Sequence, residues 1–271
     1  MAPHKPVPPR LPDAKTWHKS AVLRTVSGGL WMTDANLKSP IHVTNNLAID
    51  SLTITPVLYL SNGRRFALPE VKIPPSGTAV LSVNDALQLQ GIAPWGTLFG
   101  YVEIEYRWPW DAICATVRNT DVAHSLVFAY NLRAPLPANP QDQAGSPPGA
   151  HVVEGMWWKQ ESGVTGFVAL SNTQSQPVTA TVEATDNAAS VFAKHTVKIS
   201  PYGTKMVLLQ ELKQSAGSEG GIRVTYDGAE RGLMINGGLE DQSTGYSANL
   251  PFASASPAWT KVSRISYAEV G

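Results

Sequence analysis

Apolar and polar residues alternate along several short stretches of the chain. Leu52–Pro56 reads Leu-Thr-Ile-Thr-Pro, and Val178–Val182 reads Val-Thr-Ala-Thr-Val. A period of two places one side of a strand in a core and the other in water, and threonine suits the wet side of a pleated surface. Val71–Ile73 and Val197–Ile199 also alternate, and a Pro-x-Gly-Thr turn follows each of them.

Short strands separated by turns predict an all-β fold built as an antiparallel sandwich. Only Asn84–Leu87 and Gln210–Lys213 have a composition that suits a single helical turn. No long helical period occurs in the sequence, which argues against alternating βαβ units.

The chain repeats itself after 126 residues (197 − 71), where Val71–Ile73 meets Val197–Ile199. Self-similarity over a domain-sized length predicts two copies of one folding unit. Matching pairs in this alignment include Trp31 with Trp157, Asn46 with Asn172 and, after the shift falls to 120 (226 − 106), Tyr106 with Tyr226.

Proline-rich stretches divide the two copies from the rest of the chain. Residues 1–16 are expected to form an extended N-terminal extension, and residues 133–150 are expected to form a semi-extended linker. The predicted β-sandwich domains therefore cover residues 17–132 and 151–252, and a C-terminal tail covers residues 253–271.

The order of these features resembles bacterial extracellular immunoglobulin-like or fibronectin-like accessory modules. The resemblance covers both copies, and it implies two tandem antiparallel Ig-like β-sandwich domains of a usually non-catalytic kind. It names no ligand. The stretches of the second copy that carry it are Ala169–Asn172, Val178–Val182, Val197–Thr204 and Gly221–Gly228.

Charge and composition exclude several classes of function. The 21 basic and 21 acidic residues give a formal net charge of 0, so nothing favours binding to nucleic acid or to an anionic membrane. A single cysteine excludes an intrachain disulfide framework and a cysteine-built zinc site. No apolar stretch is long enough to predict a membrane-spanning helix.

The sequence has no signal peptide, so it is either cytoplasmic or an exported protein whose signal has been removed. Its charge-poor composition, rich in Thr, Ser, Asn and Gly, favours an extracellular or cell-envelope location, and a cytoplasmic location stays open.

Motifs for catalysis are missing from the sequence. The six histidines form no His-x-x-x-His spacing, and neither Gly-x-Ser-x-Gly nor a phosphate-binding glycine motif occurs. Cys114 lies in an apolar stretch and is predicted to pack in the core. Glu103 and Glu105 share one side of a strand and are predicted to face water, rather than to form a catalytic pair. We therefore predict no catalytic residue, no metal site and no cofactor.

The tryptophans carry the main functional hypothesis. Trp31 and Trp157 recur at matched positions, which predicts packing in the core. The segment Tyr106–Asp111, here called the tryptophan segment, holds two more tryptophans around a proline where the second copy has an Asp-Gly turn. Large aromatic side chains at an exposed hairpin tip usually pack against another molecule or domain, which here is the other copy, a protein partner or a sugar ring. The candidate binding residues are Trp108, Trp110, Trp95, Arg107 and Asp111.

The leading prediction is a non-enzymatic structural, adhesion-type or accessory protein that makes protein–protein contacts or assembles with itself. The alternative is a carbohydrate-binding module that uses exposed tryptophans, and a third possibility is a hydrolase or metal enzyme whose site the sequence does not reveal. Because each copy has its own set of strands, the two copies are expected to fold independently when the chain is cut near residue 142.

Overall fold

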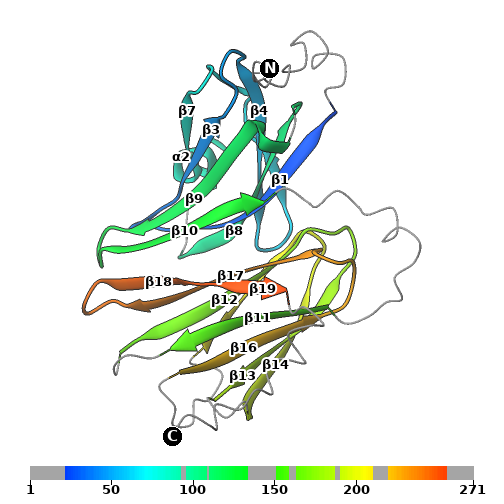
Figure 1. Cartoon of the computed structure of the whole chain (residues 1–271). Helices are drawn as coiled ribbons and strands as arrows, with labels where there is room; N and C mark the ends of the chain where they lie inside the picture. Colours follow the sequence, from blue (N-terminus) through cyan, green and yellow to red (C-terminus); the bar gives the residue numbers. More distant parts are fainter. Residues whose placement is uncertain are drawn as a thin grey trace, which may run out of the picture.

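Two parts of the chain, residues 22–133 and residues 151–254, build separate antiparallel β-sheets (Figure 1). We call them the N-terminal half and the C-terminal half. The computed structural model describes residues 22–92, 96–108, 110–133, 151–158, 163–186, 190–209 and 219–254. Strands dominate these residues and one short α-helix occurs among them, so the all-β prediction is confirmed.

The N-terminal half forms one ten-stranded sheet with the main strand order β5-β4-β8-β1-β10-β9-β3-β7, in which β2 also pairs with β9 and β6 with β4. Its strands are β1 (Arg24–Thr33), β2 (Leu37–Lys38), β3 (Pro40–Asn45), β4 (Leu52–Leu60), β5 (Arg65–Ala67), β6 (Val71–Ile73), β7 (Thr78–Ser82), β8 (Leu98–Tyr106), β9 (Ile113–Asp121) and β10 (Leu126–Arg133). A 3-10 turn, η2 (Trp110–Ala112), leads into β9.

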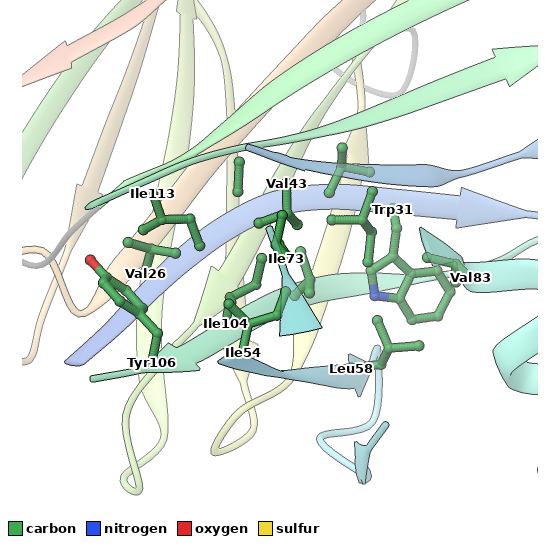
Figure 2. Packing of buried hydrophobic residues seen from close by; sticks show 14 of the residues in the cluster. Val26, Trp31, Val43, Ile54, Leu58, Ile73, Val83, Ile104, Tyr106 and Ile113 are labelled. Carbon is green, nitrogen blue, oxygen red and sulfur yellow. The ribbon is translucent and has the colours of Figure 1, made fainter. Parts of the chain in front are cut away.

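A β-bulge at Gly28 and Gly29 bends this sheet, because the register of β1 against β8 shifts between Gly28 and Leu30. Gly29 has a φ of +65°, and a Cβ atom there would lie 2.6 Å from the side chain of Val117. The two ends of the sheet enclose one apolar core, which we call cluster 1 (Figure 2). Its members include Val26, Trp31, Ile41, Val43, Ile54, Leu58, Val102, Ile104 and Val117.

The C-terminal half forms two sheets, with strand orders β14-β13-β16-β11-β19 and β15-β12-β17-β18. A second apolar core, cluster 2, includes Val168 and Leu170 of the four-stranded sheet and Val182 and Val224 of the five-stranded sheet. The strands are β11 (His151–Trp158), β12 (Thr165–Asn172), β13 (Val178–Thr185), β14 (Val191–Ile199), β15 (Thr204–Leu208), β16 (Glu219–Tyr226), β17 (Leu233–Asp241), β18 (Tyr246–Leu250) and β19 (Phe252–Ser254).

The helix α2 (Val83–Leu89) begins where the sequence predicts a helical turn. The side chain of Ser82 accepts a hydrogen bond from the backbone N–H of Asp85 at 3.2 Å, which caps the first turn. The helix buries Val83 and Leu87 and is longer than the single turn that was predicted. The second predicted turn, Gln210–Lys213, lies outside the described residues.

Asn45 and Asn172 make matching contacts in the two halves. Each side chain amide donates to a backbone carbonyl a few residues further on, at 2.8 Å to Asp50 for Asn45 and at 2.7 Å to Gln176 for Asn172. Each also donates to the carbonyl of the residue before the Pro-x-Gly turn, at 2.9 Å to Pro74 and at 3.0 Å to Ser200. Each side chain oxygen accepts an N–H from two residues further on, at 2.9 Å. The sequence alignment pairs Asn46 with Asn172, which is wrong by one residue, because the segment from Trp157 to Asn172 is one residue longer than the segment from Trp31 to Asn45 and the comparison allows no gap there.

Cys114 is exposed, so the prediction that it packs in the core is wrong. Its neighbours Ile113 and Ala115 are buried in cluster 1, and side chains of a strand point alternately to its two faces. The alternation between buried and exposed positions could not be recognised from the sequence around Cys114, because small residues such as alanine and cysteine occur on both faces of a strand.

The two halves meet at a third apolar core, cluster 3. From the N-terminal half it contains Leu30, Met32, Leu126, Phe128 and Tyr130. From the C-terminal half it contains the buried residues Phe167 and Ala169, with Met206 and Leu208 packed against them. We call this contact between the halves the seam. Because each half contributes buried residues to the same cluster, the seam argues against independent folding of the two copies.

Side chains join the strand edges β10 and β18 at the seam. The Ser247 hydroxyl accepts the N–H of Val127 at 2.9 Å and lies 3.0 Å from the carbonyl oxygen of the same residue. The Asn249 side chain accepts the N–H of Ala129 at 3.4 Å and donates to the carbonyl oxygen of Ala129. Two polar side chains thus satisfy backbone groups of β10 that would otherwise need a further strand.

Candidate functional site

The tryptophan segment follows β8 at one end of the N-terminal half. Trp108 is half-buried and packs against cluster 1, where an exposed hairpin tip was expected. Arg107 and Asp111 are exposed. Trp95 lies outside the described residues, and so does the side chain of Trp110. Of the five predicted binding residues, the structure therefore brings Arg107, Trp108 and Asp111 together at one end of the sheet.

Exposed aliphatic side chains adjoin the tryptophan segment. Val22 and Leu23 are 60% and 51% exposed, and they directly precede Arg24, the register partner of Tyr106. Ile49, 75% exposed, belongs to a loop that is tied to the segment on its other side. We call the surface formed by Arg107, Trp108 and Asp111 with Val22, Leu23 and Ile49 the tryptophan surface. Sequence reasoning missed the three aliphatic residues, because their positions next to the segment depend on strand pairing.

Hydrogen bonds fix the loop that carries Ile49. The Asn46 side chain donates to the carbonyl oxygen of Asp111 at 2.9 Å, and the Asn46 N–H donates to the carbonyl oxygen of Ala112 at 2.9 Å. The loop and the 3-10 turn η2 are therefore held side by side. A partner that covers one of them would also touch the other.

Tyr106 connects this end to the core. It is a member of cluster 1, and burial raises the pKa of its hydroxyl to about 12. The negative charge of Asp111 raises the pKa as well, and the positive charge of Arg24 opposes the change. Both charged groups therefore act on the same hydroxyl. The tryptophan surface thus combines apolar side chains with charges of both signs.

Glu103 is half-buried, so the prediction that both glutamates face water is wrong for this residue. It lies on the outer side of β8, on the same face as Tyr101, and its carboxylate interacts with the side chains of Tyr59 and Ser27. Burial raises the pKa of Glu103. Glu105 is also half-buried and forms an ion pair with Arg65 at 3.2 Å.

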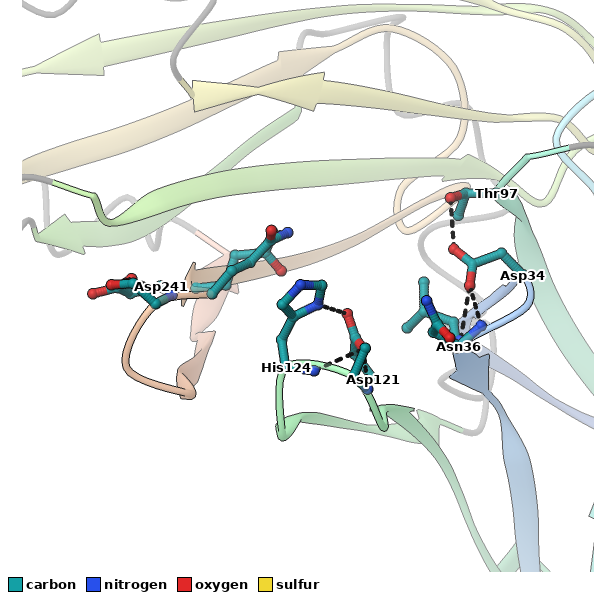
Figure 3. A network of polar contacts seen from close by, with 11 residues as sticks. Asp34, Asn36, Thr97, Asp121, His124 and Asp241 are labelled. Carbon is teal, nitrogen blue, oxygen red and sulfur yellow. Dashed lines mark hydrogen bonds and ion pairs between the residues drawn. The ribbon is translucent and has the colours of Figure 1, made fainter.

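Polar residues of both halves surround the hairpin turns at the edge of the seam (Figure 3). His124 Nδ1 lies 2.8 Å from a carboxylate oxygen of Asp121. Burial is the main cause that raises the pKa of Glu240 in the C-terminal half, and the charge of Asp121 adds to it while His124 opposes it. Asp121 and Glu240 therefore place negative charges on opposite sides of the seam.

No cluster of three or more His, Cys, Asp or Glu side chains suited to a metal ion occurs among the described residues. The part of the chain that the structure describes also contains no helix long and apolar enough to cross a membrane. Neither a family model nor a curated protein matches this chain.

Proposed function

We propose that this protein is a non-enzymatic structural or accessory protein that binds a protein partner through the tryptophan surface. The observation that carries the proposal is the exposure of Val22, Leu23 and Ile49, each more than half exposed, on stretches that strand pairing and hydrogen bonds hold beside the tryptophan segment. Contiguous apolar side chains on a surface usually mark a contact with another molecule.

The apolar area supports a contact of moderate strength. Complete burial of a Val, Leu or Ile side chain is worth about 1.5–3 kcal/mol, so covering these half-exposed residues contributes about 1–2 kcal/mol each. The charges of Arg107 and Asp111 then fix the orientation of the partner, since charges at the rim of an interface contribute mainly to specificity. A sugar ligand is less favoured, because Trp108 packs one part of its ring against cluster 1.

We further propose that the two halves are copies of one immunoglobulin-like β-sandwich module and that the protein works outside the cytoplasm. Matching contacts of Asn45 and Asn172 support the first part. The left-handed turn residues Ser76 (φ +53°) and Tyr202 (φ +57°), which precede matching glycines, support it as well. The charge-poor, threonine-rich composition supports the second part.

Site-specific photo-crosslinking in the producing cells tests the partner-binding surface. A photoreactive amino acid at position 49 is expected to capture a defined protein, and Leu23→Asp in the same chain is expected to abolish the capture. Position 80 is the matched control, because Val80 is 60% exposed on β7, away from the tryptophan segment in the strand order. Equal capture at positions 49 and 80, or capture that survives Leu23→Asp, contradicts the proposal.

A further inference from the structure

Three tyrosine rings stack across the seam. Tyr59 of β4 and Tyr101 of β8 are directly paired neighbours, with ring centroids 4.6 Å apart and ring planes within 1° of parallel. Tyr202 comes from the turn between β14 and β15 in the C-terminal half. Its ring centroid lies 5.5 Å from that of Tyr59, at an interplanar angle of 24°. Tyr59 therefore lies in contact with one ring from each half.

The turn that carries Tyr202 is held against the N-terminal half. The N–H of Thr204 donates to the carbonyl oxygen of Ser61 at 2.9 Å. Gly63 has a φ of +86°, and a Cβ atom at this position would collide with the carbonyl oxygen of Pro201. The close approach of the two turns fixes the position of the Tyr202 ring over Tyr59. The left-handed conformation does not itself require tyrosine, since Ser76 adopts it in the N-terminal half.

A carboxylate next to the stack can accept a proton from the central tyrosine. Glu103 lies beside the Tyr59 hydroxyl and, after burial, is the next cause that raises its pKa, while the side chain of Arg65 opposes this change. Glu103 also accepts a hydrogen bond from Ser27 at 3.3 Å. Burial raises the pKa of Tyr59 to about 12, so this ring is a neutral phenol near neutral pH. A phenol that loses one electron becomes a strong acid, and Glu103 is in place to take its proton.

The other two rings differ from Tyr59 in ways that matter for oxidation. The Tyr101 hydroxyl is buried and has no hydrogen-bond partner among the described residues, so an oxidised Tyr101 could not lose its proton. Tyr202 is half-buried, and among the three rings it is the most accessible to an oxidant. Oxidation is therefore expected at Tyr202 and at Tyr59, the two rings that belong to different halves.

We propose that Tyr59 and Tyr202 form a site of oxidative cross-linking, at which a peroxide and a haem peroxidase join the two halves through a dityrosine bond. Each phenol gives up one electron and its hydroxyl proton, and the two electrons and two protons reduce one peroxide to two waters. The two radicals couple through ring carbons next to the hydroxyl groups. Each coupled carbon then releases its hydrogen as a proton while the oxygen regains one, which restores both phenols. Glu103 takes the Tyr59 proton as the electron leaves and passes it to water, which supplies the protons of the peroxide reduction.

The test uses the full chain, a haem peroxidase and less than one equivalent of hydrogen peroxide. Dityrosine fluorescence reports the yield, and mass spectrometry of a tryptic digest reports the position. Tyr59 and Tyr202 are the only tyrosines of the tryptic peptides Ser39–Arg64 and Ile199–Lys205. We expect these two peptides to be joined, with a mass two hydrogens below their sum, in protein that stays monomeric on a denaturing gel.

Variants test the role of Tyr202 as the coupling partner and the role of Glu103 as the proton acceptor. Tyr202→Phe keeps the ring and is expected to abolish the joined peptides, whereas Tyr246→Phe, at a half-exposed tyrosine of β18, is the matched control and leaves the yield unchanged. Glu103→Gln is expected to slow the reaction about tenfold or more, because a positioned proton acceptor contributes at least that much. Dityrosine that persists in Tyr202→Phe, joins other peptides or forms only between molecules overturns the proposal, and so does peroxide consumption without any dityrosine.

Discussion

Phe128 provides the sharpest test of how the two halves are joined, because its ring lies at the centre of the seam. Its side chain is 2% exposed, and its ring centroid lies 5.4 Å from that of Phe167 at an interplanar angle of 74°. A Cβ atom on Gly238 would lie only 2.5 Å from the Phe128 ring. Changing Phe128 to alanine therefore leaves a cavity bounded by both halves, and it is expected to reduce the free energy of unfolding by about 3–5 kcal/mol.

A double-mutant cycle separates the contact across the seam from the general cost of truncation. Phe128→Ala and Phe167→Ala are made singly and together, and urea unfolding gives the free energy of each protein. Because the rings meet edge to face, the coupling between the two changes is expected to be about 0.5–1.5 kcal/mol. Phe128→Ala with Leu58→Ala is the control cycle, because Leu58 belongs to cluster 1 and the two changes should add.

Two results would refute this reasoning. A loss below about 1 kcal/mol for Phe128→Ala means that the ring does not fill a shared core. Additive effects of Phe128→Ala and Phe167→Ala mean that the two rings do not touch in solution, even when each change is costly on its own.

Four further predictions concern the cores, the charges and the thiol. Trp31→Ala is expected to cost about 3–5 kcal/mol in urea unfolding, because the indole is fully buried and donates to the Tyr101 carbonyl oxygen at 3.0 Å. Halves cut near residue 142 are expected to melt below the full chain by calorimetry, because each exposes part of cluster 3. The pKa of Glu240 is raised in the folded state, so the ionised carboxylate reduces the free energy of unfolding once the pH rises through this pKa, and the protonated carboxyl does not. Glu240→Gln should therefore increase the free energy of unfolding more at about pH 7 than at about pH 4. Cys114 should react with a thiol reagent in the native protein as completely as in urea, and a protected thiol would contradict its exposed position.

Local pattern was sufficient to predict strands that have one wet face. Val178–Thr185 alternates between buried and less buried positions as the sequence suggests, and so does Leu52–Pro56. Their threonines mark the outer face because water covers it. The helical turn near Asn84 was also predictable, since Ser82 supplies a cap directly before it.

The seam was not predicted, although two stretches carry a signal for it. Burial extends to both faces over residues 28–33 of β1 and over residues 166–172 of β12, and both stretches are nearly continuous in apolar or small residues. Such a run indicates a strand that is covered on both sides. It does not say which residues cover the second face, because those residues, such as Phe128 against Phe167, are far away in the sequence.

The polar contacts of the tryptophan surface were beyond prediction for the same reason. Arg107 and Asp111 are close in sequence and could be proposed together, but Ile49 is brought near them only by the bonds of Asn46 to Asp111 and Ala112. Glu103 was misjudged because its partners, Tyr59 of β4 and Ser27 of β1, are brought to it only by strand pairing.

The two side chains of β18 that bond to β10 also set the register of one half along the other. Ser247 and Asn249 are two residues apart, and so are their partners Val127 and Ala129. A slip of one residue would place Ala248, which has no polar side chain, against these backbone groups and leave them without partners. A slip of two residues would keep only one of the two bridges. The halves can therefore occupy only discrete positions along β10, and the observed one is the position in which both bridges form.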